Sequence, residues 1–276
     1  MFDRLKHLDP DLQEALLIQL RNLWTHTSTA IEGNTLTLGE TAFVLSEGLT
    51  VSGKPLKDHQ EVVGHARAVE LVYGLVQADR PLSEGDLSGL HAAVQKERIV
   101  DAYKPVGQWK VEPNSTVMVV DDEQIIFEYA APGDVPGLMR RWMALFEQFR
   151  RACDPIQETS RDEALRAYVH IHAAFVRIHP FWDGNGRLAR LVANIPVIRA
   201  GFPPIIIPKQ GRQEYIAALT EYHYQVGTVV GVGELLPYTD ALARFTAFCS
   251  AAWAESNRLV NNTFALQRNR ESKVQS

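Results

Sequence analysis

Apolar residues recur every three or four positions through most of this chain, the spacing of an amphipathic helix. The first stripe follows Asp9 and Pro10, which are typical of a helix start, and consists of Leu12, Leu16, Leu20, Leu23 and Trp24. The segments 59–76 and 84–94 carry the same period, and Ser83 precedes the second as a helix cap. We expect a helix at each of these places.

The same spacing returns in the second half of the chain. One stripe after Pro136 consists of Leu138, Trp142, Leu145, Phe146 and Phe149, and the next of Leu165, Tyr168, Val169, His172 and Val176. A final stripe of Leu242, Phe245, Phe248 and Trp253 favours the core or a contact between subunits. Polar residues dominate from 261 to 276, where we expect fraying.

Segment 111–129 breaks this helical spacing. Two runs rich in β-branched residues flank an acidic turn at 121–123, a pattern typical of a β-hairpin. Pro113 and Pro132 separate the hairpin from the helices, and Pro113 should interrupt strand pairing near its base. The sequence therefore predicts an all-α, mainly helical fold with one β-hairpin.

Composition narrows the class of protein. With 276 residues and 46% hydrophobic content, the chain can bury a core, and we divide it into an N-terminal helical region (1–80), a central core (81–225) and a C-terminal helical extension (226–276). A net charge of −5 and the lack of a basic stripe argue against a nucleic-acid partner. No apolar run reaches membrane-spanning length, and the N-terminus lacks a signal-peptide core. We expect a cytoplasmic protein that binds no membrane.

The two cysteines, Cys153 and Cys249, lie far apart in the sequence. They form neither a disulfide framework nor a metal-binding cluster. Two small apolar residues in a reducing compartment explain them best.

Chemically active residues cluster between His179 and Arg190. Pro180 favours a break at His179, because proline disfavours helical backbone at the preceding residue. The run Gly184-Asn185-Gly186 tolerates positive φ, which suits a tight turn that opens a helix. Backbone N–H groups at such a turn face an anion. Helical spacing resumes over 188–199, where Pro196 should kink or end the helix.

Two arginines support an anion site at this turn. Arg187 and Arg190 lie three positions apart, on one face of the first helical turn, where cations oppose the helix dipole unless an anion lies between them. Arginine also matches phosphate geometry. Asp183 offers a hard oxygen ligand for Mg²⁺ beside the phosphates, and His179 can accept a proton near neutral pH. The residues together indicate a nucleotide-phosphate site with a metal carboxylate and a histidine base.

A purely structural interpretation is the alternative. His179 would cap the preceding helix, Asp183 would pair with Arg187, and the glycines would only turn the chain. This interpretation accounts for each residue alone, but it does not explain why all of them fall within twelve positions.

The segment matches every fixed position of the signature H-x-F-x-[D/E]-G-N-G-R-x-x-R, and the chain thereby resembles the Fic family. The resemblance runs from about Thr25 to about Tyr224 and includes 53–59, 107–111 and 201–206. It implies a Fic fold and a protein adenylyltransferase (an AMPylator) that transfers AMP from ATP to a Ser, Thr or Tyr hydroxyl of a target protein or of itself. Gly186-Arg187 favours AMP transfer over the phosphate transfer of Doc relatives.

The resemblance also implies a role for each residue of the motif. His179 would be the catalytic base beside the target hydroxyl, and Asp183 would bind Mg²⁺. Gly184, Asn185 and Gly186 would form an anion hole for ATP, with Arg187 and Arg190 on its β- and γ-phosphates. Phe181 would be the buried support of the loop. The hairpin resembles the Fic flap, which would capture an unknown target protein by strand addition. Tyr215 lies where the family carries a tyrosine-rich segment near the nucleobase, although Ile216 replaces the second aromatic residue.

A second motif lies upstream, at Ser28-Thr29-Ala30-Ile31-Glu32-Gly33-Asn34. It resembles the Fic inhibitory motif [S/T]-x-x-x-E-[G/N] in its N-terminal form, with Ser28 and Glu32 at its fixed positions. A Glu32 carboxylate that pairs bidentately with Arg190 would occupy the guanidinium group that should take the γ-phosphate. The alternative is a solvated Glu32 beside a helix C-cap at Gly33.

Other functions stay open at this point. The chain could be a Fic-fold enzyme that uses another donor, such as phosphocholine, or one that mainly removes AMP with the help of Glu32. It could also be a non-catalytic nucleotide-binding interaction module, although such a module would not need both His179 and Asp183. The residues do not settle whether the chain forms a homo-oligomer.

The remaining histidines contribute no further site. Their spacing, with no cysteine or carboxylate set around them, is not that of zinc ligands. We interpret His170 and His172 as structural and assign no role to His65, His91 and His223.

Overall fold

The computed structural model describes residues 5–95, 101–120, 123–154 and 158–274. Its helices and strands follow one another as α2 (Pro10–Ile31), α3 (Leu38–Glu47), α4 (Leu56–Ala78), α5 (Glu84–Val94), β1 (Ser115–Val120), β2 (Glu123–Glu128), α6 (Val135–Ala152), α7 (Arg161–Ile178), α8 (Asn185–Val192), α9 (Asn194–Arg199), a short 3₁₀ helix η1 (Lys209–Gly211), α10 (Arg212–Val226), α11 (Asp240–Ala252) and α12 (Ala254–Val274). The predicted fold class, mainly helical with one hairpin, is confirmed.

Local signals place the starts of these helices. Helix α2 begins at Pro10 directly after Asp9, as predicted. Helix α5 begins after a capping box, in which the Ser83 hydroxyl accepts from Asp86 N and the Asp86 carboxylate accepts from Ser83 N. This box satisfies backbone N–H groups that the helix itself cannot, and it fixes where α5 starts.

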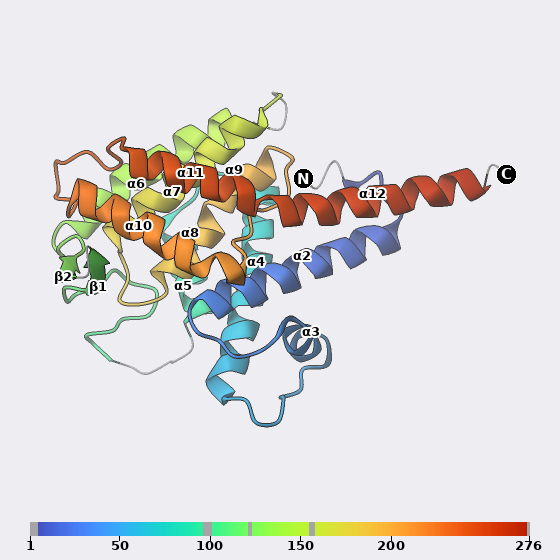
Figure 1. Cartoon of the computed structure of the whole chain (residues 1–276), viewed down its shortest axis with the longest axis horizontal. Coiled ribbons are helices and arrows are strands. Elements are labelled where there is room, and N and C mark those ends of the chain that lie inside the picture. The colour runs from blue at the N-terminus through green and yellow to red at the C-terminus, as the bar shows by residue number, and fades with distance from the viewer. Residues whose placement is uncertain (1–4, 96–100, 121–122, 155–157, 275–276) are drawn as a thin grey trace.

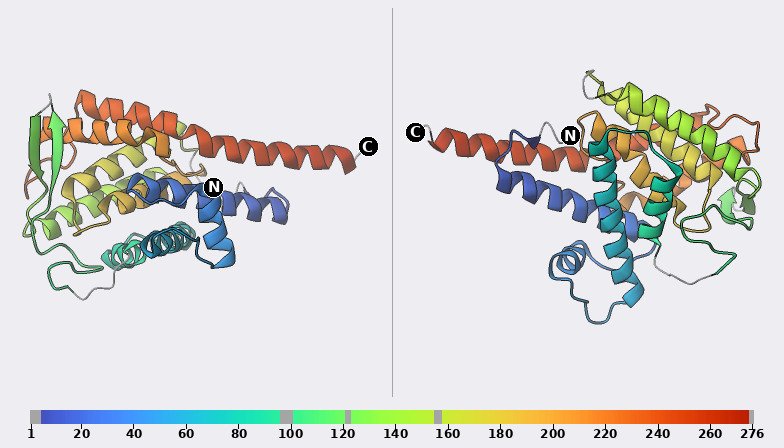
Figure 2. Two further views of the ribbon diagram at one scale, coloured as in Figure 1. Left: turned by 60° about the horizontal axis from the view of Figure 1, so that its bottom comes forward. Right: turned by 180° about the vertical axis from the view of Figure 1, so that it is seen from behind.

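Helix α7 runs through the centre of the core. It packs against α6, α8, α9 and α11, and most of its side chains are buried. Helices α10 and α11 lie side by side on one face (Figure 1). The hairpin occupies one end of the molecule, while α2 and α12 project from the opposite end (Figures 1 and 2). The stripe of Leu242, Phe245, Phe248 and Trp253 is buried in the core.

The C-terminal segment differs from its prediction. Instead of fraying from 261, α12 continues to Val274 and packs along α2. Its polar residues meet the start of α2: the side-chain oxygen of Gln267 accepts from Asp9 N at 2.9 Å, and Arg270 donates to the carboxylates of Asp9 and Asp11. The expectation of fraying was wrong because these polar side chains have polar partners on another helix.

Two prolines break the helices on either side of the motif. Helix α7 ends at Ile178, and His179 caps it in the left-handed region with φ of 54°. The predicted helix over 188–199 is divided at Ala193 into α8 and α9. Because Pro196 has no N–H, it cannot donate to the carbonyl four residues earlier. Both predicted interruptions are confirmed.

The hairpin pairs β1 with β2 in antiparallel register, from Ser115 opposite Glu128 to Val120 opposite Glu123. Pro113 lies just outside this ladder. In the predicted acidic turn, Asp121 and Asp122 lie outside the described residues. The strands are confirmed.

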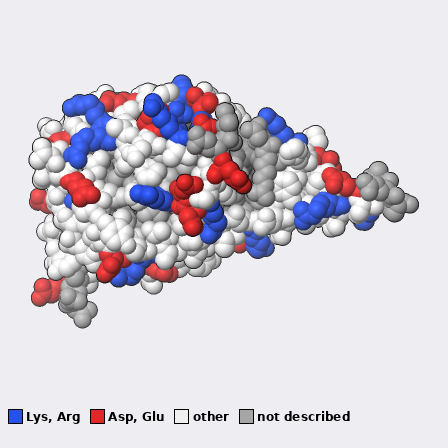
Figure 3. Space-filling model, turned by 90° about the horizontal axis from the view of Figure 1, so that it is seen from above, with Lys and Arg blue, Asp and Glu red and all other residues white. Residues whose placement is uncertain are grey.

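The predictions drawn from charge, cysteines and hydropathy can be compared with the surface and the core. On the face shown in Figure 3, basic and acidic side chains are interspersed, and the described residues there form no continuous basic stripe. Both cysteines are buried free thiols. Within the described ranges, no helix combines the length and apolar character needed to cross a bilayer. The division at 80 and 225 stays a prediction.

Candidate nucleotide-phosphate site

A pocket lies where the start of α8, the end of α2, α10 and the hairpin meet. Its lining includes nearly all the site residues predicted from the sequence: Glu32, His179, Asp183, Gly184, Asn185, Gly186, Arg187 and Arg190. Ser28 lies behind the pocket, in contact with Arg190. Two motifs more than 140 residues apart in the sequence are therefore brought to one place.

The turn that opens α8 is held by its own asparagine. Asn185 is buried; its side-chain oxygen accepts from Phe181 N at 2.9 Å, and its amide donates to Phe181 O at 2.8 Å. Phe181 is fully buried, as predicted. Gly184 has φ of 77°, in the left-handed region that glycine tolerates. The side chain of Asn185 therefore shapes the loop, and the pocket is left to the backbone of the turn.

His179 is oriented by α7 and covered by the hairpin. Its Nδ1 lies 3.2 Å from Val176 O, so Nδ1 donates there and Nε2 is left as the basic nitrogen. The ring of Tyr129 stacks on the imidazole with centroids 3.7 Å apart. Burial lowers the pKa of His179 to about 3, which keeps the ring neutral at physiological pH.

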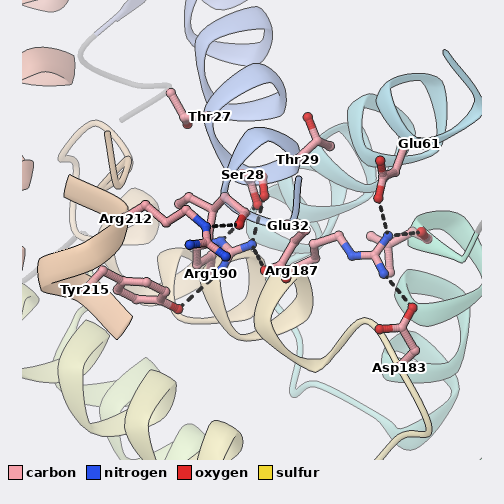
Figure 4. Close-up of polar contacts among 12 residues, drawn as sticks. Thr27, Ser28, Thr29, Glu32, Glu61, Asp183, Arg187, Arg190, Arg212 and Tyr215 are labelled. Carbon is pink, nitrogen blue, oxygen red and sulfur yellow. Dashed lines mark hydrogen bonds and ion pairs between the residues drawn. The ribbon is translucent and has the colours of Figure 1, made fainter. Parts of the chain in front are cut away.

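Arg190 is bound by the upstream motif (Figure 4). Its Nη2 donates to Glu32 Oε1 at 2.6 Å and to Ser28 O at 2.9 Å, and its Nε donates to Ser28 Oγ at 3.0 Å. The predicted contact between Glu32 and Arg190 is present, but the predicted bidentate geometry is wrong. Ser28 takes the Nε edge of the guanidinium group, so the carboxylate meets Nη2 alone.

Glu32 also lies directly against the turn. A side chain on Gly186 would place its Cβ 2.9 Å from Glu32 Oε1 and 3.3 Å from Arg190 Nη1. Glu32 follows the last residue of α2, and Gly33 has φ of 99°, so the glycine at the helix end is present. Glu32 itself is paired with Arg190, so the alternative of a merely solvated carboxylate is wrong. The carboxylate occupies the place where the helix start and Arg190 offer donors to an anion.

Arg187 turns to different partners. Its Nη1 meets Glu61 Oε1 at 3.2 Å and donates to Val94 O at 3.0 Å, while Nη2 donates to Asp183 Oδ2 at 2.9 Å (Figure 4). The pairing of Asp183 with Arg187, which the structural interpretation predicted, is therefore present. The two arginines line one pocket, yet each guanidinium group has its own carboxylate instead of converging on a single point.

The residues at the turn suit a Mg²⁺ ion that takes most of its ligands from phosphate and water. The Asp183 side chain is 59% exposed and lines the pocket. Among the residues that the structure describes, no group of three or more His, Cys, Asp or Glu side chains could hold a metal. A single carboxylate beside a phosphate site is a common arrangement for Mg²⁺, which dehydrates reluctantly.

The aromatic and imidazole groups around the pocket were partly misjudged from the sequence. His223 lines the pocket and stacks on Phe127, and His91 contacts the loop at Asp183, although neither had been assigned a role. His172 is structural, as predicted, and lies 2.9 Å from the Tyr215 hydroxyl. Arg190 donates to that hydroxyl at 3.3 Å, so the phenol of Tyr215 supports the arginine.

No pattern in the local sequence indicates that residues such as His91 and Glu61 contact the motif. His91 and Asp183 are 92 positions apart, and the partner of Arg187, Glu61, is 126 positions away. Their spacing matches no helical or strand period, so only the packed fold reveals the contacts. Tyr129, at the end of the hairpin, had no signal beyond its aromatic ring.

Comparisons with known proteins agree with this geometry. Residues 81–196 match the model of the Fic/DOC family. The protein adenylyltransferase fic-1 of Caenorhabditis briggsae is 30% identical over an alignment of 259 residues. The match covers 91% of this chain and 46% of that protein. The protein adenylyltransferase Fic of Drosophila persimilis is 29% identical over 223 residues, 81% of this chain and 38% of that protein. This chain spans less than half the length of these relatives.

Solved structures give the same picture of the fold. A Fic domain-containing signalling protein from Bacteroides thetaiotaomicron superposes with a TM-score of 0.77 at 25% identity, and the match covers 95% of each chain. Fic-1 from Caenorhabditis elegans, residues 134–508, superposes with a TM-score of 0.68 at 26% identity, over 95% of this chain and 69% of that one. The arrangement of helices and hairpin is thus shared with these proteins.

Proposed function

We propose that this chain, whose residues 81–196 match the model of the Fic/DOC family, is a protein adenylyltransferase that transfers AMP from ATP to a protein hydroxyl. The observation that carries the proposal is the position of Glu32. Its carboxylate lies against Gly186 and Arg190, at the start of α8. An anion held there by this chain's own side chain supports a site built for anions, and ATP is the AMP donor of the enzymes that the chain resembles.

The reaction requires a base and an electrostatic cradle. His179 Nε2 accepts the proton of the target hydroxyl, and the oxygen forms a bond to the α-phosphorus of ATP. The bond from that phosphorus to the oxygen bridging to the β-phosphate breaks, and pyrophosphate leaves with the electron pair. Backbone N–H groups of Gly184, Asn185 and Gly186 would face the developing negative charge. Transfers of this kind depend mainly on positioning and charge neutralisation.

Asp183 is the residue that would hold Mg²⁺ against the phosphates, and the ion would neutralise part of their charge. To do so, its carboxylate would leave Arg187. Arg187 would keep Glu61 as a counter-charge, since that pair does not depend on Asp183. The chain thus offers a metal ligand whose departure leaves no buried cation unpaired.

We propose that the hairpin receives the unknown target protein. Thr116 and Met118 of β1 and Tyr129 after β2 line the pocket. A target segment paired along the hairpin would bring its hydroxyl beside His179 while using main-chain hydrogen bonds, which demand little of its sequence.

We further propose that Glu32 inhibits transfer. Arg190 cannot take the γ-phosphate while Glu32 Oε1 occupies Nη2 at 2.6 Å, so ATP would bind in an unproductive pose. The side chain of Glu32 is also 37% exposed. Its carboxylate can therefore leave Arg190 by turning into solvent, without burying its charge elsewhere.

Intact-mass spectrometry tests the proposal. Wild type, Glu32→Gly and His179→Ala are each incubated with ATP and Mg²⁺, alone and with a cell lysate depleted of small molecules. We expect an added AMP mass in the Glu32→Gly protein or its targets, less in wild type, and none in His179→Ala. An added mass other than AMP would indicate another donor. The absence of any modification in Glu32→Gly, in both settings, would reject the transferase and favour the binding module.

A further inference from the structure

The last turn of α5 contacts the loop that carries the predicted anion hole. His91 in that turn is fully buried, and its ring stacks on Phe181 with centroids 4.1 Å apart. Its Nε2 lies 3.2 Å from the backbone carbonyl of Asp183, and its Nδ1 accepts from Gly107 N at 2.7 Å. One imidazole therefore joins the motif loop to the segment that leads into the hairpin.

These contacts fix the tautomer of His91. Because Nδ1 accepts a hydrogen bond from a backbone N–H, it carries no proton. An imidazole carries at least one N–H, so the proton of His91 is on Nε2. Nε2–H therefore donates to the Asp183 carbonyl.

The donated hydrogen bond determines the orientation of one peptide group. In a trans peptide the C=O and the following N–H point in opposite directions. Since the Asp183 carbonyl is turned toward α5, the N–H of Gly184 is turned away from α5, on the side where Gly184 lines the pocket. At Gly184, with φ of 77°, steric limits are weak, so the backbone alone would not fix this peptide.

We propose that His91 is a positioning residue for the transfer reaction, which holds the Asp183–Gly184 peptide so that the Gly184 N–H faces the phosphate. The inference rests on the proposed function for its catalytic consequence, but the orientation of the peptide can be measured without it. His91 touches neither substrate nor metal; it acts through the backbone of the loop.

The loop is held to the same hairpin segment at two other carbonyls. Lys110 N donates to Pro180 O at 2.9 Å, and Asn114 donates to Phe181 O at 3.0 Å. These bonds fix the position of the loop as a whole. The His91 bond is the one placed next to the peptide that carries the Gly184 N–H, so its loss should turn that peptide without releasing the loop.

The test uses three substitutions at His91, each made in the Glu32→Gly protein. His91→Gln keeps an amide donor at the position of Nε2. His91→Asn keeps only a group near Nδ1, and His91→Phe keeps the ring against Phe181 without either hydrogen bond. The matched control is His59→Phe, since His59 is also buried and also bridges two backbone groups, Val51 N and Pro55 O, but these groups lie outside the motif loop.

We expect His91→Phe and His91→Asn to lower kcat roughly 10- to 100-fold, as expected for a misplaced anion-hole donor, with a smaller change in KM for ATP. His91→Gln should restore most of kcat. His59→Phe should lower thermal stability about as much as His91→Phe and leave kcat within about threefold of the parent. Equal kcat in His91→Phe and the parent would overturn the proposal, and so would a failure of His91→Gln to exceed His91→Phe.

A second measurement separates this inference from the proposed function. The amide resonance of Gly184 is followed by NMR during titration with inorganic pyrophosphate, without Mg²⁺. We expect a large shift in Glu32→Gly and in His91→Gln and a much smaller one in His91→Phe. If the Glu32→Gly protein transfers no AMP but its Gly184 amide responds in this pattern, the proposed function fails and the positioning role stands. An equal response in all variants would reject the positioning role.

Discussion

Arg187 and Arg190 lie one turn apart on α8 and are both buried, but their counter-charges differ. Glu61, which pairs with Arg187, has a side chain only 4% exposed, whereas the side chain of Glu32, which pairs with Arg190, is 37% exposed. Burying a charge without an opposite charge beside it is costly. The buried pair of Arg187 and Glu61 is therefore stable only while both side chains stay in place. One arginine therefore has a permanent counter-charge, and the other has one that can leave.

The difference would allow one site to be fully assembled and also inhibited by Glu32, as proposed above. Glu61 comes from the second turn of α4 and also accepts from Asn34 at 2.8 Å, so it belongs to the packed interior. Glu32 follows the final residue of α2 and can turn into solvent. An incoming phosphate would have to replace Glu32 on Arg190, while Arg187 would keep Glu61. The unfolding free energy, the affinity for ATP and the pH dependence of stability each provide a test of this contrast.

The largest effect is expected from Glu61→Ala. It leaves Arg187 with only the exposed Asp183 as counter-charge and should lower the free energy of unfolding by about 3–5 kcal/mol, the cost typical of breaking a buried ion pair. Glu32→Ala, the matched control, should cost less than about 1 kcal/mol because its partner stays hydrogen bonded to Ser28. Urea unfolding measures both. Similar losses in the two variants would mean that the two carboxylates are equivalent.

The second prediction concerns nucleotide binding. Glu32→Gln removes the charge that competes with phosphate for Arg190 and should raise the affinity for ATP roughly 10- to 100-fold, the equivalent of one hydrogen bond between charged groups. Isothermal titration calorimetry with ATP measures this, and His179→Ala in the same protein prevents turnover. Glu61→Gln is the control and should not raise the affinity. An unchanged affinity in Glu32→Gln would show that the carboxylate does not compete with the nucleotide.

The third prediction uses His65, which is fully buried beneath both arginines. Burial, together with the positive charges of Arg190 and Arg187, lowers its pKa to about 3. Between its ordinary pKa of about 6.5 and about 3, the unfolded chain binds a proton there that the folded chain does not, so stability falls as the pH is lowered through this window. The loss from His65 alone should reach about 2 kcal/mol at pH 5.

Urea unfolding at pH 7.5 and pH 5 isolates this contribution. The difference in unfolding free energy between the two pH values should be smaller by about 2 kcal/mol in His65→Gln than in wild type. If His65→Gln shows the full wild-type pH dependence, the imidazole does not feel the two arginines as the structure indicates.

Features with a local physical cause could be predicted from the sequence. Ser83 and Asp86 form the capping box that starts α5, Pro180 and Pro196 end helices because of their own rings, and the alternation after 115 gives the hairpin. The motif turn belongs to the same class, since Gly184 tolerates the left-handed backbone and Asn185 hydrogen bonds to the nearby Phe181. These elements come from interactions among residues close in sequence.

Features that depend on distant partners could not be predicted. Nothing near His91 indicates that its imidazole meets Asp183, and the geometry at Arg190 was missed because Ser28 shares the guanidinium group with Glu32. The helical tail after 261 is stabilised by Asp9 and Asp11 at the other end of the chain. In each case the polar group has a partner more than 90 positions away, which residue type and spacing do not reveal.

The smallest effect, expected from Ser28→Ala, separates the contact that holds Arg190 in place from the contact that we propose to be inhibitory. The hydroxyl accepts from Arg190 Nε at 3.0 Å, whereas the backbone oxygen of Ser28 and the carboxylate of Glu32 both take Nη2. The substitution removes only the first bond and should cost about 1 kcal/mol in urea unfolding. ATP affinity should change by less than about twofold, because Glu32 still competes with the phosphate. Thr29→Ala, which removes a hydroxyl bonded within α2, should leave both quantities closer to wild type. A rise in ATP affinity as large as that in Glu32→Gln would mean that Ser28 restrains the carboxylate through Arg190, and that the releasable counter-charge is the serine and glutamate together.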